Sequence, residues 1–385
     1  MKKRGKKQIV VGILFILLLG TVGCQPVTKD EESGIVTIQD QKQQWNKDSC
    51  ASYTLERKEY DRKKLWKDFI KEDNTYTVWD YGKETKNGEP AQYTKTGKEL
   101  LENPPKHFQH ALTVGEPDSL TFVKGDFTMS LEEFCLYEYD EKEAAEELLQ
   151  YETAVGTVAM SRVSTIDFLN PDWLDRELSF AKRADIAKKA VETLAEYGIK
   201  VSEDMDIYAI TGQDIVKSYK KEWEAIKEVK DSDLDTDYAV DGYYVQAYIT
   251  ADGIRVVNHE NAEVGEDEVN RNLPVINMYY TAEGLQYLEV RNYQQAGKRT
   301  KDGAVISYEK AMEILMAQYK GVQSDTDTYE YQGGRLEYLP VERQETVQLT
   351  PVWTFRGKRI RNMNKSKNVT DELFMVDAYT GKIIR

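Results

Sequence analysis

The stretch that decides the fold is GYYVQAYITADGIRVVNHE, residues 242–260. Apolar and aromatic side chains occupy every second position of its first half, which predicts a strand with one face in the core. The alternating positions are Tyr243, Val245, Ala247 and Ile249. The pair Asp252-Gly253 then supplies the residue types of a tight hairpin turn, so the stretch predicts a β-hairpin.

A second stretch of the same kind follows, VINMYYTAEGLQYLEVRN at residues 275–292, with its turn expected at Glu283-Gly284. Two amphipathic helices are expected before these hairpins, one ending at Gly198 and one beginning near residue 211. Helices followed by an antiparallel meander predict an α+β domain over residues 171–298.

The pattern resumes at the C-terminus, where ISYEKAMEILMAQYKGV predicts a helix and LTPVWTF and FMVDAYTGKIIR predict strands. Asp377 and Thr380 can cap a tight turn through side-chain bonds to the backbone, and Gly381 supplies the permissive φ. The A-x-E-x-L pattern of both regions, 121 residues apart, is explained either by an internal duplication or by the general pattern of amphipathic helices.

These C-terminal motifs, SYEKAMEI, LTPVWTF and FMVDAYTGKII, resemble the PepSY-type domains of exported bacterial proteins. They also resemble the extracytoplasmic YycH/YycI-type regulators of a sensor kinase. The resemblance covers residues 303–385 and implies a helix on an antiparallel sheet. It implies binding or regulation outside the membrane and lends no catalytic residues. The layout of the whole chain resembles uncharacterised lipoproteins of gut Gram-positive bacteria.

The N-terminal part is divided into three segments. Residues 51–170 alternate between strand-like runs and helix-prone runs such as EKEAAEELLQYE, so a small mixed α+β domain is expected there. Residues 24–50 are mostly polar without a sustained period, which predicts a flexible, disordered tether reaching roughly 28 Å. The fold class predicted is therefore α+β, with tandem modules of a helix packed on an antiparallel meander sheet behind this mixed domain and tether.

The leader, residues 1–23, has five basic residues before an apolar run from Ile9 to Gly23. As a helix this run reaches roughly 22 Å, short of the ~30 Å hydrocarbon core, so it predicts an export signal. The segment Thr21-Val22-Gly23-Cys24 resembles the lipobox of bacterial lipoproteins, with Thr21 where Leu is usual. That resemblance implies cleavage before Cys24, lipidation such as palmitate on its thiol, and a location on the extracellular face of the cell membrane. An uncleaved anchor, or cleavage without lipid, is the alternative.

Charge excludes two classes of partner. The formal net charge is −15, and removing residues 1–23, which carry five positive charges and no negative ones, takes it to −20. A nucleic-acid binder needs a basic surface, so none is expected here. Electrostatic attachment to an acidic membrane is excluded for the same reason, and the lipid would supply the membrane contact.

Two further cysteines remain after Cys24. In an exported protein, Cys50 and Cys135 can form a disulfide. Cys135 also lies in an apolar run where a buried thiol is equally natural, so both alternatives stay open.

Three other groups of residues resemble metal-binding or catalytic sites, but none has the full pattern that such a site needs. His107 and His110 lack a third metal ligand nearby, and the acidic run at residues 231–237 lacks the Gly and Glu of a calcium loop. Glu132 and Glu133 could imitate a glycosidase pair, but 67 acidic residues produce such pairs by chance. No metal, cofactor or catalytic residue is predicted.

The hypothesis from the sequence is a noncatalytic surface lipoprotein that contacts a protein partner at the cell envelope. An exposed sheet edge or a face of the Tyr-rich strands would supply the contact. The alternative is a cell-envelope hydrolase using carboxylates in residues 51–170. A solute-binding lipoprotein fits less well, because it normally needs parallel sheets.

Overall fold

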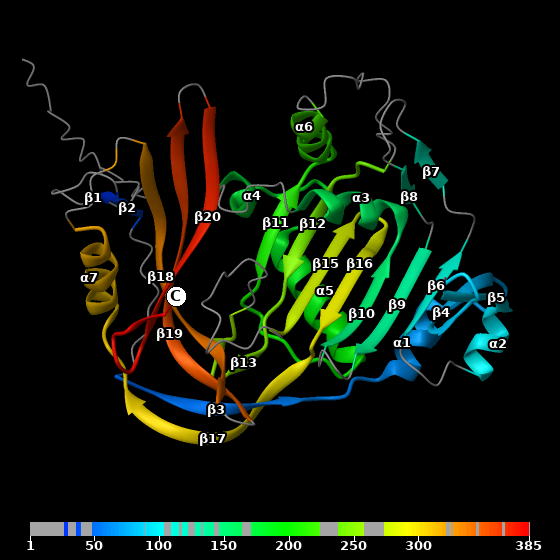
Figure 1. Ribbon diagram of the computed structural model, residues 1–385, viewed down its shortest axis with the longest axis horizontal. Helices are drawn as coiled ribbons and strands as arrows, with labels where there is room; N and C mark the ends of the chain where they lie inside the picture. Colours follow the sequence, from blue (N-terminus) through cyan, green and yellow to red (C-terminus); the bar gives the residue numbers. More distant parts are fainter. Residues whose placement is uncertain are drawn as a thin grey trace, which may run out of the picture.

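Strand-forming residues dominate the chain, and they assemble into two large sheets with helices on their faces (Figure 1). The computed structural model describes residues 27–384 except 30–35, 40–47, 89, 104–108, 115–117, 122–127, 132–133, 142–145, 164–170, 224–237, 258–272, 321–323, 325, 344–345 and 364–365. The predicted α+β class is confirmed, with the sheets making up most of the fold.

Sheet B is the larger of the two, with nine antiparallel strands in the order β11-β12-β15-β16-β10-β9-β6-β4-β5. Its strands are β4 (Thr75–Glu84), β5 (Pro90–Thr96), β6 (Gln109–Val114), β9 (Phe134–Glu141), β10 (Glu146–Glu152), β11 (Asp206–Ile210), β12 (Gly242–Gln246), β15 (Val275–Thr281) and β16 (Gly284–Arg291).

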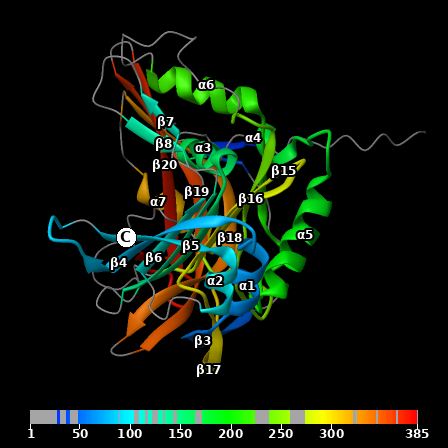
Figure 2. The same ribbon diagram turned by 90° about the vertical axis from the view of Figure 1, so that its right-hand side faces the viewer.

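Helices cover both faces of sheet B around its strands β11 to β16, with α5 on one face and α3, α4 and α6 on the other (Figure 2). Ile186, Ala190 and Leu194 form the apolar stripe of α5, which ends where Gly198 takes a φ of 78°. The helices around sheet B are α1 (Arg62–Phe69), α2 (Gly97–Glu102), α3 (Ala154–Val163), α4 (Pro171–Asp175), α5 (Arg183–Glu196) and α6 (Gly212–Trp223).

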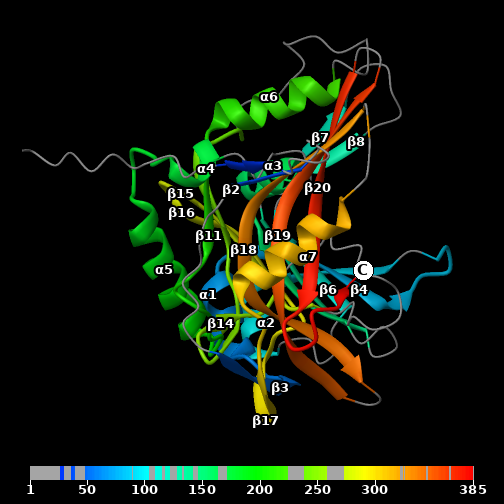
Figure 3. The same ribbon diagram turned by 90° about the vertical axis from the view of Figure 1, so that its left-hand side faces the viewer.

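Sheet A has eight strands, with β1-β2-β18-β19-β20-β21 in a row and β3 joining β19 to β17. Its strands are β1 (Val27–Lys29), β2 (Val36–Gln39), β3 (Ser49–Arg57), β17 (Gln294–Ala304), β18 (Asp327–Arg343), β19 (Thr346–Met363), β20 (Ser366–Asp377) and β21 (Ile383–Ile384). The helix α7 (Tyr308–Gln318) lies against sheet A (Figure 3). The ring centroid of its Tyr308 lies 5.7 Å from that of Trp353 on β19.

Two short hairpins complete the described chain. They are β7 (Asp118–Thr121) with β8 (Thr128–Leu131), and β13 (Thr250–Ala251) with β14 (Ile254–Arg255). In the second, Asp252 and Gly253 both have a positive φ, as their turn requires. The turn lies where the sequence places it, but β12 pairs with β11 and β15 instead of folding back on β14.

The sheets do not follow the predicted domain limits. Sheet B combines strands from residues 51–170 with strands from residues 171–298, while β3 and β17 cross into sheet A. The predicted helix-prone run after residue 141 is wrong from Glu146 onward, because β10 lies between β9 and β16 and completes the sheet there. Hydrogen bonding in a central strand overrides helix propensity.

Part of residues 24–50, expected as a flexible tether, forms a strand of sheet A instead. β2 pairs in parallel with the start of β18, and its Val36 and Ile38 are fully buried. Because Val36 and Ile38 occupy alternate positions, both side chains point to the same face of the strand and are buried there. Their burial stabilises this short strand within a mostly polar segment. No helix in the described part of the chain is long and apolar enough to cross a membrane.

Candidate functional site

Four charged side chains meet where the two sheets face each other. Asp206 comes from β11 of sheet B, Arg255 from β14, Glu337 from β18 and Arg356 from β19. We call these residues the inter-sheet cluster. Glu337 is fully buried, and the side chain of Arg255 is 3% exposed.

Backbone pairing brings Arg255 to this position. Its neighbour Val256 forms an isolated parallel bridge with Tyr338 of β18, and the N–H of Val257 donates to the Tyr338 carbonyl at 2.8 Å. Residues 255 and 337 each precede a member of that bridge. Their side chains therefore meet on the side of β18 that faces sheet B.

Hydrogen bonds engage both carboxylates of the inter-sheet cluster. Arg255 donates through Nε to Glu337 Oε1 at 2.6 Å and through Nη1 to Asp206 Oδ1 at 3.1 Å. Arg356 Nη2 lies 3.1 Å from Glu337 Oε2, and the Thr354 hydroxyl donates to the same oxygen at 2.5 Å. Tyr248 donates to Asp206 Oδ2 at 2.6 Å, and its ring centroid lies 4.1 Å from the Arg255 guanidinium.

The two arginines keep these carboxylates ionised. Burial by itself would raise the pKa of Glu337, but the charges of Arg356 and Arg255 outweigh burial and lower it to about 2. Burial likewise opposes the ionisation of Asp206, and the same two guanidinium groups bring its pKa below the usual range. A carboxylate held in this way is a structural ion near neutral pH and does not serve as a general acid.

A second polar network crosses sheet B from the same aspartate. Strand register places one polar residue on each of five neighbouring strands at one level of the sheet. These residues, which we call the cross-strand row, are Asp206, Gln246, Asn277, Glu289 and Gln150. Asn277 and Glu289 are 2% and 4% exposed, which is unusual for side chains of this polarity.

Glu289 is the centre of the hydrogen bonding in this row. Its carboxylate accepts from Arg291 Nη2 at 2.5 Å, from Asn277 Nδ2 at 3.1 Å and from the Tyr287 hydroxyl at 3.3 Å. Arg291 extends toward solvent, with its side chain 33% exposed. The Glu289–Arg291 pair therefore balances its own charge at the border of the buried region.

Asn277 is the exception within the row. Among the residues that the structure describes, its Oδ1 is buried and has no hydrogen-bond partner. The bond from Nδ2 to Glu289 fixes which end of the amide carries the oxygen, because a carboxylate needs a donor. A buried acceptor without a partner costs about 1–3 kcal/mol, so this oxygen is where a further donor would be accommodated.

The tyrosine-rich strands do not form the exposed platform considered from the sequence. Tyr243 and Tyr280 face α5, whereas Tyr244 and Tyr279 face α3 and α6, and all four are at most 2% exposed. Tyr248 is buried in the inter-sheet cluster. Helices cover both faces of the sheet, so both alternating sets of tyrosines are buried.

The cysteines fall in different places. Cys24 lies outside the described residues, so lipidation stays a prediction. Cys50 lies buried on β3, with Sγ 3.1 Å from the Tyr338 hydroxyl. The side chain of Cys135 lies outside the described residues, so its pairing with Cys50 and the alternative of a buried thiol at Cys135 stay predictions. Cys135 belongs to β9 of the other sheet, which separates the two cysteines by topology.

Asp377, Thr380 and Gly381 lie at the turn between β20 and β21. Asp377 Oδ1 accepts from the Thr380 N–H at 2.7 Å and from its hydroxyl at 2.9 Å, and Gly381 has a φ of 71°. These contacts return Ile383 to pair with Val376. The residues serve the fold at this position.

Most of the remaining candidate metal-binding and catalytic residues lie outside the part of the chain that the structure describes. His107, Glu132, Glu133 and residues 231–237 lie outside the described residues, and of His110 only its backbone, on β6, is described. Within the described part of the chain, no three His, Cys, Asp or Glu residues are grouped to hold a metal ion.

Sequence analysis missed the residues of both networks. A signal was present, because Arg255, Glu337, Asn277 and Glu289 interrupt apolar strand patterns at positions where polar side chains become buried. Which of them meet depends on pairing between strands far apart in sequence.

Comparison with known proteins adds a likeness in fold. No family model matches the chain, and no curated protein matches it at a significant level. Among solved structures, an uncharacterized protein from Eubacterium rectale is similar, with a TM-score of 0.52, 16% sequence identity and coverage of 91% of each chain. At this identity the likeness shows the fold alone, and it extends over nearly the whole α+β arrangement of both proteins.

Proposed function

We propose that this chain is a noncatalytic binding or regulatory lipoprotein, held on the extracellular face of the cell membrane by lipid on Cys24. Its partner would be another protein at the cell envelope. The observation that carries the noncatalytic half is the inter-sheet cluster, a largely buried group of four charged side chains. Both of its carboxylates accept hydrogen bonds from several donors and stay ionised.

The binding half is supported by the edge of sheet B. β5 ends the strand order and pairs with β4 alone among the described strands. Its Gln92 and Thr94 are exposed and uncharged. An edge of this kind can receive an extended peptide as an additional strand.

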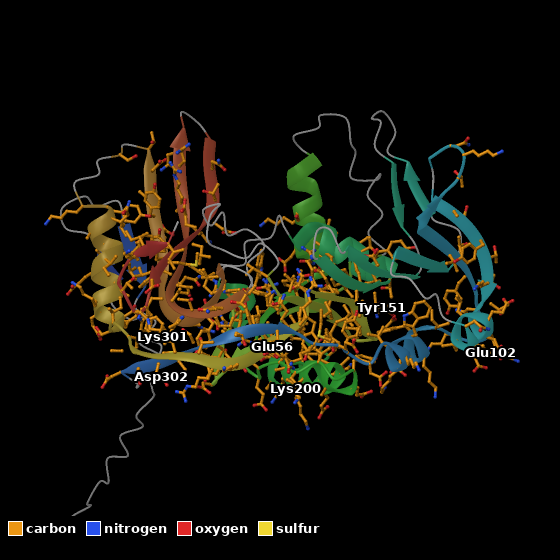
Figure 4. All side chains as sticks on the ribbon, turned by 60° about the horizontal axis from the view of Figure 1, so that its bottom comes forward. Glu56, Glu102, Tyr151, Lys200, Lys301 and Asp302 are labelled. Atoms are coloured by element: carbon orange, nitrogen blue, oxygen red, sulfur yellow. The ribbon has the colours of Figure 1, made fainter. Side chains whose placement is uncertain are left out.

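Strand β17, which pairs with β3 at one edge of sheet A, is less suited to such pairing. β17 carries Arg299 and Asp302, 58% and 62% exposed, and Figure 4 shows Lys301 and Asp302 together toward one end of this ribbon, with Glu56 of β3 farther along it. Charged side chains on an edge strand discourage pairing with another chain. Between β5 and β17, the contact is assigned to β5.

Membrane attachment is tested with the Cys24→Ser variant of the full chain. We expect palmitate labelling and recovery in the membrane fraction for the original chain, and loss of both for Cys24→Ser. An unlabelled original chain, or one that keeps Met1, would refute the lipid anchor.

Binding is tested by cross-linking and recovery of partners from membranes that carry the lipidated chain. The double change Gln92→Lys with Thr94→Lys should abolish recovery, because two charges oppose strand addition. Glu192→Gln on the exposed side of α5 removes one negative charge, so it also makes the net charge more positive, and it should leave recovery intact. Equal recovery by both variants, or cleavage of envelope polymers by the purified protein, would reject the proposal.

A further inference from the structure

The turn between β4 and β5 carries the one Asn-Gly pair of the sequence, Asn87-Gly88. The turn runs from Thr85 to Gly88, and the Gly88 N–H donates to the Thr85 carbonyl at 3.0 Å. This turn projects away from the rest of the molecule (Figures 2 and 3). All of residues 85–88 are exposed, so solvent reaches the pair.

The geometry at Gly88 leaves room for the Asn87 side chain to approach the backbone. A Cβ placed on Gly88 would meet no heavy atom of the described residues within 4 Å beyond its chain neighbours. Gly88 has a φ of 79°, which a residue with a side chain rarely adopts. The nitrogen of Gly88 is therefore accessible from the side on which another residue would carry its Cβ.

An exposed asparagine followed by glycine can react with its own backbone. The Gly88 nitrogen, after losing its proton to solvent, attacks Cγ of Asn87 and forms a C–N bond. The bond from Cγ to the side-chain nitrogen breaks, and that nitrogen takes up a proton and leaves as ammonia. Water then opens the resulting cyclic imide at one of its two carbonyls, which gives either aspartate or isoaspartate. The reaction needs only water and no oxidant or reductant.

Other asparagines of the chain lack one of these conditions. Asn74 is exposed, but the next residue is Thr75, whose branched Cβ stands beside the attacking nitrogen. Asn277 is 2% exposed, and its side-chain nitrogen donates to Glu289. Exposure and a following glycine thus coincide at Asn87.

The hydrogen bond from Gly88 to Thr85 sets when the reaction can occur. The Gly88 N–H is engaged while the turn is closed, so the nitrogen reacts when this bond opens. Exposed hairpin tips open locally at a small fraction of the free energy of global unfolding. The folded protein therefore does not need to unfold for Asn87 to react.

We propose that Asn87 is a site of spontaneous deamidation, at which the folded protein converts asparagine to isoaspartate and aspartate. Both products carry a negative charge in the turn that leads into β5 at Pro90. Isoaspartate also lengthens the backbone path between Glu84 and Pro90, which pair across the hairpin. This reaction goes beyond the protein contact proposed above and needs neither lipid nor a partner protein.

The test incubates the purified full chain in detergent at neutral pH, in water labelled with heavy oxygen, and maps its peptides by mass spectrometry. Label at residue 87 marks hydrolysis during the incubation and separates it from changes during digestion. Conversion at Asn87 should be at least about tenfold faster than at Asn74, because glycine places no Cβ beside the attacking nitrogen. An Asn87 that keeps its amide, or that converts no faster than Asn74, would overturn the proposal.

Two variants assign the added charge to this turn. Isoelectric focusing should show a more acidic form accumulating in the original chain and not in Asn87→Gln, whose longer side chain places the amide carbon farther from the next nitrogen. Asn74→Gln, also at an exposed position, is the matched control and should accumulate the acidic form as the original chain does. Accumulation in Asn87→Gln at the original rate would overturn the proposal.

Both variants change an exposed side chain, so neither is expected to affect folding, and far-UV circular dichroism checks this. Neither readout involves membranes or partner recovery. Failure at Asn87 is therefore distinguishable from failure of the lipoprotein proposal.

Discussion

The inter-sheet cluster and the cross-strand row share Asp206, and both bury ionisable groups, yet they differ in completeness. In the cluster, Arg255 and its neighbours engage the oxygens of both carboxylates. In the row, Asn277 leaves one buried acceptor without a partner in the described chain. A complete network contributes to holding two sheets together, whereas an incomplete one leaves a buried polar atom whose desolvation is not compensated.

The largest expected effect comes from removing the charge that the cluster shares. Arg255→Met leaves the buried Glu337 and the partly buried Asp206 without their common partner, so the free energy of unfolding should fall by about 3–5 kcal/mol. Urea unfolding measures the loss. Arg299→Met on exposed β17 is the matched control and should leave the midpoint unchanged. Equal behaviour of the two variants would remove the distinction between the cluster and an ordinary surface pair.

Acid should weaken the cluster in a defined window. The pKa of Glu337 in the folded protein is about 2, below its ordinary value of 4.5. Its ionised form therefore stabilises the fold fully above pH 4.5, and this contribution of about 3 kcal/mol declines as pH falls toward 2. Urea unfolding between pH 6 and pH 2.5 should show this slope, and Glu337→Gln should flatten it. A parallel slope in that variant would assign the acid sensitivity to other groups.

A matched pair of hydroxyl deletions compares the two networks directly. Tyr248→Phe removes a 2.6 Å bond to Asp206, and Tyr287→Phe removes a 3.3 Å bond to Glu289. The first should cost about 1.5–3 kcal/mol and the second less than about 1 kcal/mol, because short bonds to buried charges contribute more. Chemical unfolding of both variants at neutral pH gives the ranking, and a reversed order would contradict it.

The smallest change in stability is expected at the unpartnered acceptor. Asn277→Leu gives up the donor to Glu289 but also removes a buried oxygen without a partner, so stability should change by less than about 1 kcal/mol. Equilibrium unfolding in urea measures this change in stability. A loss as large as that of Arg255→Met would mean that Asn277 is as structural as the cluster.

Local pattern was sufficient for the elements whose partners are close in sequence. The stripe of Ile186, Ala190 and Leu194 predicted α5, and alternation predicted the meander at β15 and β16, although its turn residues are Ala282 and Glu283, one position earlier than expected. The C-terminal turn at Asp377 depends on bonds between neighbours and was readable in the same way.

By itself, then, the sequence determined the α+β class, the amphipathic helix α5 and the tight C-terminal turn, since each depends on residues close to one another in the chain. Only the tertiary structure decided that strands from both sides of residue 171 share sheet B, that the tyrosines are buried on both faces, and that β10 is a strand despite its helix-prone composition. It also decided which buried polar residues meet. The physical reason is that pairing partners such as Arg255 and Glu337 lie 82 positions apart, and a periodic pattern records which face is buried but not what covers it.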